Sequence, residues 1–183
     1  MSETQNSINN REAILNVIGS AVISTEIHSE QLTVIVAGDN LVEVANNLKN
    51  NSETKFEQLL DVTAIDWAES NGDKERFQVI YFLYSLTHNH RVRIKVNVSE
   101  DDCISPSLTS VWESANWYER EAYDMYGIKF SDHPDMRRFY MPEDFADPDS
   151  GEPLYPLRKD FPLGGIPDSL PLPSYPEKFG NPT

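Results

Sequence analysis

The chain has 183 residues, of which 39% are hydrophobic and 25% charged, enough for one compact domain followed by a tail. Its 30 acidic and 15 basic side chains give a net charge of −15, and so acidic a surface repels nucleic acid and anionic lipid as direct partners. Basic protein partners fit this charge better.

The N-terminal part of the chain predicts two helices and a hairpin. A first helix is expected over residues 7–18 and ends at Gly19. Residues 21–27 and 31–37 are expected to pair as a hairpin, because apolar side chains recur there at every second position. A second helix follows Asn40, which stands at the N-cap with Glu43 at the capping-box position. Its apolar face has helical spacing and consists of Leu41, Val44, Ala45 and Leu48.

Three strands are expected next, over residues 59–67, 77–86 and 91–98. The middle segment is almost wholly apolar, which predicts a central strand covered on both faces. The last segment alternates strictly and predicts a half-exposed antiparallel strand, with Arg91, Arg93 and Lys95 on its outer face. A solvated sheet face is the simpler interpretation of these cations. The alternative is a docking face for an acidic partner.

A further helical region is expected after residue 104. Ser105 as cap and Pro106 at the first helical position predict a helix start. Its apolar stripe would be Leu108, Val111, Trp112 and Ala115. Asn116 has the features of a second cap, with Glu119 at the capping-box position, and this helix ends at Gly127. Residues 1–130 are therefore predicted to form an α+β domain with a mixed or antiparallel sheet and helices packed on it.

Proline separates this domain from the rest of the chain. Eleven of the 12 prolines lie from Pro134 onward, together with many aromatic residues. Regular helices and central strands do not tolerate this composition. Residues 131–183 are therefore predicted to form an extended arm. Docking on another protein and folding back on its own domain remain equally open for this arm.

Catalytic chemistry has little support in the sequence. Glu119, Glu121 and Asp124 could suggest paired carboxylates, but Glu119 and Glu121 are two residues apart on a helix and point in different directions. No Gly-rich loop follows a strand, so nucleotide or flavin binding has no basis. We expect no catalytic or cofactor-binding residue in this chain.

Metal binding, membrane spanning and export are likewise not indicated. The histidines show no metal-ligand spacing, and only the turn with His88 and His90 could form a weak metal site. Cys103 is the single cysteine, so the chain can form neither an intrachain disulfide nor a four-thiolate iron–sulfur site, and a reducing cytoplasm is the simplest setting. The longest apolar run, residues 79–84, is far shorter than the roughly 20 residues of a membrane helix. The first residues lack the pattern of a signal or transit peptide.

Residues 115–161 instead carry a pattern suited to recognition. Arg137 and Arg138 precede a stretch, 139–157, with five acidic residues and no basic one, and a second cationic pair follows at 158–159. Arginine binds carboxylates well in dry interfaces. Pairing with a partner is our interpretation, and intrachain pairing that pins the arm is the alternative. The interface candidates are Glu119, Arg120, Glu121, Asp124, His133, Arg137, Arg138, Arg158, Lys159, Asp160 and Phe161.

These residues carry a family resemblance. The chain resembles the 30-kDa subunit, also called the C subunit, of respiratory complex I, the proton-translocating NADH:quinone oxidoreductase. The resemblance rests on ANWYERE at 115–121, DMYGI at 124–128, HPD at 133–135, the arginine pair at 137–138 and PLRKDFPL at 156–163. Residues 60–67 and 77–98 also fit the family in order. Residues 146–155 are longer and more acidic than the short link typical of the family.

The resemblance implies a role that the residues alone do not supply. Family members are non-redox subunits of the peripheral arm near the quinone module, while FMN, Fe-S clusters and quinone are bound by neighbouring subunits. The implied partners are the large quinone-site subunit and cluster-bearing neighbours. The implied location is the cytoplasmic side of the inner (plasma) membrane, where the complex holds the chain peripherally. The alternatives are the equivalent subunit of a membrane-bound nickel-iron hydrogenase complex, or a stand-alone soluble enzyme or binding protein that uses residues 119–133.

Overall fold

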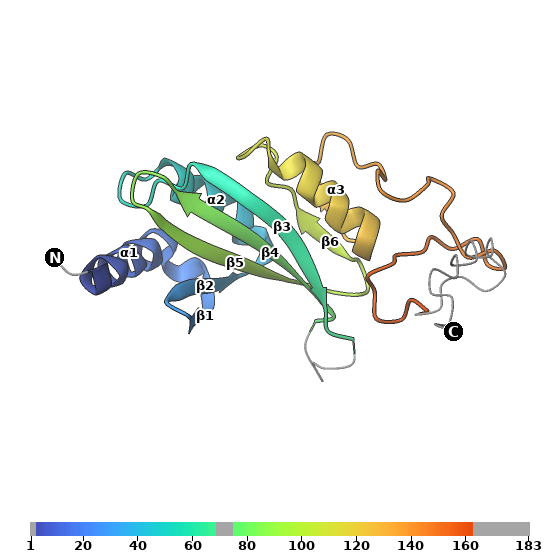
Figure 1. The fold of residues 1–183 in the computed structure, drawn as a ribbon, viewed down its shortest axis with the longest axis horizontal. Coiled ribbons are helices and arrows are strands. Elements are labelled where there is room, and N and C mark those ends of the chain that lie inside the picture. The colour runs from blue at the N-terminus through green and yellow to red at the C-terminus, as the bar shows by residue number, and fades with distance from the viewer. Residues whose placement is uncertain (1–2, 69–74, 163–183) are drawn as a thin grey trace, which may run out of the picture.

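The computed structural model describes residues 3–68 and 75–162 of the chain, with side chains from residue 9 onward. Residues 163–183, the last part of the predicted arm, lie outside the described residues. The described residues form a five-stranded sheet, three α-helices and a small two-stranded sheet (Figure 1). The predicted α+β class is thus confirmed.

The N-terminal unit contributes two helices and a hairpin. Helix α1 spans Glu3–Ile18, so it begins earlier than predicted, and a short 3-10 turn, η1 (Gly19–Ala21), leads into β1 (Val22–His28) and β2 (Gln31–Val36). A second turn, η2 (Gly38–Asn40), precedes α2 (Leu41–Asn50). The predicted apolar face of α2 is confirmed, because all four of its residues are buried. The predicted capping box is wrong: Asn40 ends the η2 turn in helical conformation and its side chain makes no capping hydrogen bond.

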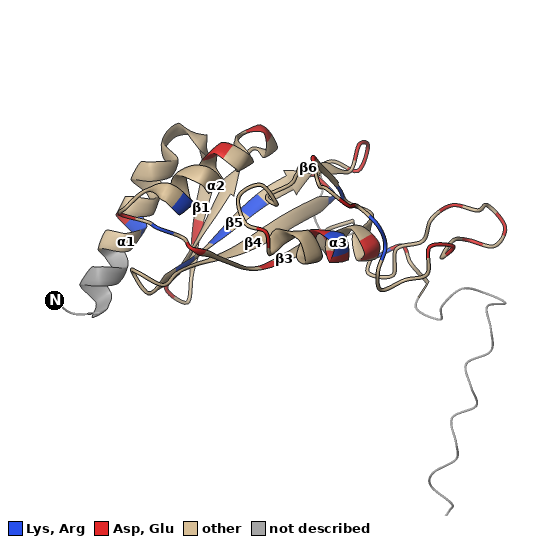
Figure 2. Ribbon diagram, turned by 90° about the horizontal axis from the view of Figure 1, so that it is seen from above, with Lys and Arg blue, Asp and Glu red and all other residues tan. Residues whose placement is uncertain are grey.

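The main sheet has the strand order β1-β2-β5-β4-β3. Strands β3 (Gln58–Asp66), β4 (Phe77–Ser85) and β5 (His90–Val98) form an antiparallel meander, and β2 joins β5 in parallel. Helices α1 and α2 lie on one side of this sheet (Figure 2). The alternate strand residues of that side belong to the buried core, including Val34, Tyr81 and Ile94. The opposite side is called the open face below.

One-sided covering explains where the strand predictions succeed and fail. The alternation of β5 is confirmed, with Val92, Ile94, Val96 and Val98 buried. The expected covering of β4 on both faces is wrong, because Phe82 and its alternate neighbours on the open face, apart from the buried Ile80, are only half-buried.

The segment after β5 departs most from expectation. Ser105 and Pro106 do not start a helix. They belong to β6 (Ile104–Pro106), which pairs in parallel with β7 (Lys129–Ser131). The chain then runs through turns to α3 (Ala115–Tyr126). The predicted stripe residues are all buried, but mostly from turns rather than from a helix. Helix α3 packs on β3 and ends, as predicted, at Gly127 in the left-handed conformation.

Candidate interface site

All the interface candidates lie on α3 or on residues 131–162, which run along α3 and back to the sheet. The centre of this arrangement is Asp124, whose side chain is fully buried. Its Oδ2 accepts the backbone N–H groups of Phe139, Tyr140 and Met141 at 3.1, 2.7 and 2.9 Å. Its Oδ1 accepts from Arg138 Nη1 at 3.2 Å. One carboxylate therefore fixes the start of the arm against α3.

Arg120 lies one helical turn before Asp124 but does not bind it. The guanidinium donates to the backbone carbonyls of Arg137 and Arg138, at 3.0 and 3.3 Å. It also lies 5.0 Å from the ring centre of Trp117 and 5.3 Å from that of Phe139. Residues four apart lie on one face of a helix, and Arg120 and Asp124 hold the same segment, Arg120 through its carbonyls and Asp124 through its N–H groups.

A second attachment point holds the far end of the described arm. Asp66 accepts the backbone N–H of Lys159 at 2.8 Å and pairs with Arg76 at 2.9 Å, and Arg76 also pairs with Asp160 at 2.8 Å. Burial raises the pKa of Asp66, but the hydrogen bonds from Arg76 and from the Lys159 backbone outweigh it and hold that pKa below its usual value. Arg158 donates to the carbonyl of Tyr126 at 2.6 Å.

The remaining candidates take separate positions. Glu119 is fully buried and accepts from Ser107 Oγ at 2.6 Å and from the Leu108 N–H at 2.7 Å, so it holds the preceding turn instead of forming the predicted capping box. Burial raises the pKa of Glu119 to about 7. Glu121 points elsewhere and is half-buried, and burial together with the charge of Asp61 raises its pKa.

His133, Arg137 and Phe161 make local contacts. The Nδ1 of His133 accepts the N–H of Asp135, so its Nε2 carries the proton and donates to the carbonyl of Asn116 at 3.1 Å. Burial lowers the pKa of His133. Arg137 pairs with Asp135 at the surface, where solvent screens the pair. The ring of Phe161 lies near that of Phe145, with 6.2 Å between the centroids.

The structure thus supplies intrachain partners for Arg138, Arg158 and Asp160, which is the alternative that the sequence left open. Contact of the candidates with another protein stays a prediction. Sequence reasoning missed Asp66 and Arg76, because their role depends on where the arm returns to the sheet.

An exposed aromatic cluster was also missed as an interface candidate. Trp117, Phe139 and Tyr140 form it, with their side chains 59%, 37% and 56% exposed. The rings contact one another in a row, with centroid distances of 5.5 and 4.0 Å. A large aromatic surface that is rigidly held yet exposed is typical of protein-binding sites. The signal was present in the sequence as three aromatic residues on two segments, but only folding brings them together.

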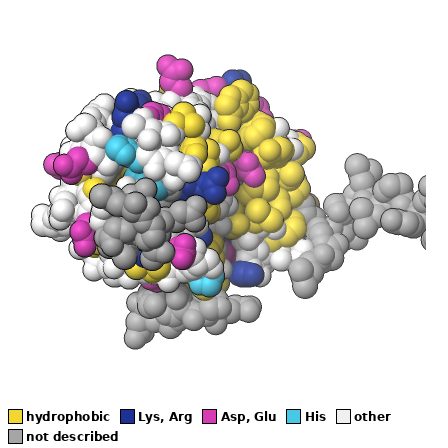
Figure 3. Space-filling model, turned by 60° about the vertical axis from the view of Figure 1, so that its left-hand side comes forward, with side chains coloured by type: hydrophobic (Ala, Val, Ile, Leu, Met, Phe, Trp, Pro, Cys, Tyr) yellow, Lys and Arg dark blue, Asp and Glu magenta, His cyan; other side chains and the backbone are white. Residues whose placement is uncertain are grey.

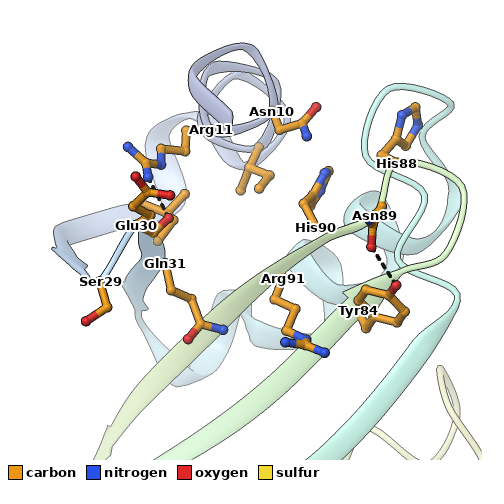
Figure 4. Close-up of a pocket in the computed structure, with 12 residues that line it drawn as sticks. Asn10, Arg11, Ser29, Glu30, Gln31, Tyr84, His88, Asn89, His90 and Arg91 are labelled. Atoms are coloured by element: carbon orange, nitrogen blue, oxygen red, sulfur yellow. Dashed lines mark hydrogen bonds between the residues drawn. The ribbon is translucent and has the colours of Figure 1, made fainter. Parts of the chain in front are cut away.

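The histidine turn lies at the other end of the sheet, beside a hollow of about 570 Å³ between α1, the β1–β2 turn and the β4–β5 turn (Figure 4). His88 and His90 stack there, with 5.9 Å between ring centres, and His90 points toward α1. Burial, with His88 as a second cause, lowers the pKa of His90 to about 4, so it is uncharged at neutral pH. Within residues 3–68 and 75–162, no three His, Cys, Asp or Glu side chains gather as a metal site would require.

Comparison with known proteins identifies the family. Residues 34–167 match the family described as respiratory-chain NADH dehydrogenase, 30 Kd subunit, and this range runs from β2 past the described arm. The chain belongs to this 30-kDa subunit family.

Several relatives in the 30-kDa subunit family are named as the C subunit of NADH-quinone oxidoreductase. Those of Hyphomonas neptunium, Dinoroseobacter shibae and Paramagnetospirillum magneticum are 43%, 46% and 43% identical over 145, 144 and 155 residues. The matched regions cover 79–84% of this chain but only 66%, 62% and 72% of those relatives. The chain therefore spans about two thirds of their length.

Two solved structures resemble this member of the 30-kDa family. One is described as the trypsin-resistant fragment (1-134) of Nqo5, with 32% identity and a TM-score of 0.55, covering 61% of this chain and 88% of that one. The other belongs to a membrane-bound sulfane sulfur reductase, an archaeal respiratory membrane complex, with 26% identity and a TM-score of 0.67, covering 88% and 87%. None of the helices in the described part of the chain is long and apolar enough to cross a membrane.

Proposed function

We propose that this chain is a non-redox subunit of the peripheral arm of proton-translocating NADH:quinone oxidoreductase. It supports the quinone module while electrons pass from NADH through FMN and Fe-S clusters in neighbouring subunits to quinone. The observation that carries this proposal is the family match, which runs without interruption from within β2 through β3, β4, β5 and α3 to the described arm. The role follows from membership of a subunit family rather than from a reactive group.

The chemistry of the described residues supports a structural role. The buried ionisable groups Asp66, Glu119 and Asp124 are each engaged by donors of the same chain, so they fix backbone segments rather than face a cleft. Burial raises the pKa of Cys103, which disfavours a reactive thiolate. Substrate chemistry is accordingly assigned to other subunits.

The docking surface of this proposal combines α3 with the arm. Trp117 and Tyr140 supply exposed aromatic area beside the fixed cation Arg120, and this combination dominates the free energy of many interfaces. The proposed partner at this surface is the large quinone-site subunit, with cluster-bearing subunits as further neighbours. Such contacts hold the chain peripherally, on the cytoplasmic side of the inner membrane.

A second candidate function is the equivalent subunit of another membrane-bound respiratory complex, such as one with a nickel-iron hydrogenase. The resemblance to a chain of the archaeal sulfane sulfur reductase complex favours keeping it, because that structure matches 88% of this chain. A stand-alone enzyme or binding protein has weaker support, since Glu119 is buried and bonded to the Leu108 N–H, while His133 bonds to the carbonyl of Asn116.

The test is purification of the tagged full chain from gently solubilised membranes, followed by identification of its partners and an NADH:quinone activity assay. The proposal predicts flavin- and cluster-bearing subunits together with that activity. Recovery with a hydrogenase would favour the second candidate, and a partner-free chain would refute both.

Truncation of the aromatic cluster tests the docking surface. Trp117→Ala should reduce recovery in the complex by about 30-fold, as for an interface hot spot worth ~2 kcal/mol. Leu86→Ala is the matched control, because Leu86 is similarly exposed, at 55%, but lies in the β4–β5 turn. Equal recovery of the two variants would refute this placement of the interface.

A further inference from the structure

The open face of the sheet has an unusual charge arrangement. Strand β5, at the centre of the sheet, places Arg91, Arg93 and Lys95 on this face. Their cross-strand neighbours on β4 are Tyr84, Phe82 and Ile80. Figure 3 sees this side of the molecule obliquely, and hydrophobic side chains gather there in a broad area with Lys and Arg beside them. The centre of the open face is therefore both cationic and apolar.

The two arginines are held by aromatic rings. The Arg91 guanidinium lies 5.3 Å from the ring centre of Tyr84, and that of Arg93 lies 5.8 Å from the ring centre of Phe82. Arg91 and Tyr84 lie close together beside the end of the sheet (Figure 4). Stacking limits the rotamers of both guanidinium groups, so less conformational entropy is lost when a carboxylate binds them.

These arginines lack acidic partners in the described part of the chain. Lys95 pairs with Glu26 at 3.3 Å, whereas no ion pair among the described residues includes Arg91 or Arg93. Arg93 donates to the amide oxygen of Gln31, and its Nε is buried without a hydrogen-bond partner. Acidic side chains are plentiful in a chain with a net charge of −15. It is therefore unusual that neither Arg91 nor Arg93 has an acidic partner among the described residues.

The apolar part of the face resembles the core of an interface. Ile35 and Ile65 are half-buried, and Ile80 is only 6% exposed although no helix covers it. Register places Ile35 and Ile80 on either side of Lys95, and Ile65 beyond β4 on β3. Long cationic side chains lie across apolar neighbours in this way when their charged ends stay accessible. A partner that covered this face would bury apolar area and meet charge at the same time.

We propose that the open face is a second docking site, which takes an acidic segment of another protein. Carboxylates of that segment bind Arg91 and Arg93, and its aliphatic side chains cover Ile35 and Ile65. Protein is the partner because the face offers apolar side chains beside its cations, and one polypeptide segment can supply carboxylates and aliphatic side chains together. The identity of the partner as another subunit of a respiratory complex rests on the proposed function. The docking chemistry is independent of that function.

The experiment places a photo-activated cross-linking amino acid at Asn97, which is exposed on the open face, in the full chain within native membranes. The same amino acid at Asn47, exposed on α2, is the control on the opposite side. The expected product is a cross-link from position 97, and not from 47, to a peptide with Asp or Glu. Arg91→Glu should then lower its yield about tenfold, as expected for a broken interface charge pair. Lys129→Glu is the matched charge reversal away from this face, and it should leave the yield unchanged.

A reciprocal exchange completes the test. Replacing the captured acidic residue by Arg should restore the cross-link in the Arg91→Glu variant. Equal yields for Arg91→Glu and Lys129→Glu would overturn the proposal, as would capture of a second copy of this chain or of a peptide without acidic residues. Co-purification is scored separately. Loss of respiratory partners with a retained charge-dependent cross-link would refute the proposed function alone, and the reverse pattern would refute only this docking site.

Discussion

Replacing Asp124 by Asn should detach the start of the arm while leaving the sheet folded. The Asn side chain has the same shape, but it lacks the charge that three backbone N–H groups and Arg138 share. Hydrogen bonds to a charged acceptor are roughly twice as strong as neutral ones. Arg138 is also largely buried, with a side chain 7% exposed, and would lose its ion-pair partner.

The expected loss is about 3–5 kcal/mol, the range for removal of one member of a buried ion pair. Because the arm can open locally and return Arg138 to water, much of this loss should appear as local opening. The amides of Phe139, Tyr140 and Met141 should therefore exchange hydrogen about a hundredfold faster or more, since each 1.4 kcal/mol is a factor of ten.

Hydrogen exchange of the isolated chain, followed residue by residue, measures this effect. Asp132→Asn is the control, because it makes the same chemical change at an exposed position. Strand β5 amides should keep their protection in both variants. If the three amides of the Asp124 variant exchange less than tenfold faster than in the unmodified chain, the carboxylate does not hold the arm and the reasoning is wrong.

Three further predictions concern the other contacts of α3 and the arm. Gly127→Ala should lower the free energy of unfolding, measured by urea denaturation, by about 3 kcal/mol, and Gly151→Ala by only about 1–2 kcal/mol. Both glycines have positive φ, but only at Gly127 would the new Cβ also clash, because it would lie 2.7 Å from Arg158 Nη2. Equal losses would show that the arm does not pack on this glycine. Between pH 4.5 and about 7, Glu119 keeps its proton in the folded chain and loses it in the unfolded chain. The free energy of unfolding should therefore fall by up to ~3 kcal/mol as the pH rises through this range. Glu119→Gln should remove that slope from denaturation curves measured at pH 5 and 7.5, and an unchanged slope would contradict the raised pKa. Arg158→Ala should cost about 2 kcal/mol and Lys159→Ala under ~0.5, because Lys159 binds Asp66 only through its backbone, and the opposite order would refute this assignment.

Elements with a clear periodic pattern of apolar side chains were predictable from the sequence. The apolar face of α2 and the alternation of β5 fix which side of each element meets the core. The turn region after Pro106 was not predictable in this way. Leu108, Val111 and Trp112 have helical spacing and are buried, but pairing with β7 holds Ser105 and Pro106 extended where the predicted helix would begin.

The interface candidates show the same limit. Their types and positions indicated a recognition region, yet the pairing of Asp124 with residues 139–141 could not be derived from spacing. That pairing depends on the path of the chain between α3 and Tyr140, which includes no regular element after β7. Sequence identified the charged residues, and the loop path selected which of them meet.

The parallel pairing of β2 with β5 has a consequence for how the chain acquires its structure. Leu32 of β2 lies opposite Val92 of β5, whereas the strands of the β3–β4–β5 meander join neighbours along the chain. Contacts between distant positions form slowly, because a long loop must close before they are gained. On the ribosome, β2 would therefore emerge well before the strand that completes it, with only the β1 hairpin to satisfy its backbone. The β3–β4–β5 meander then acts as the folding template. Until it has been synthesised, one edge of β2 lacks its partner strand, and the N-terminal unit is exposed to misassembly.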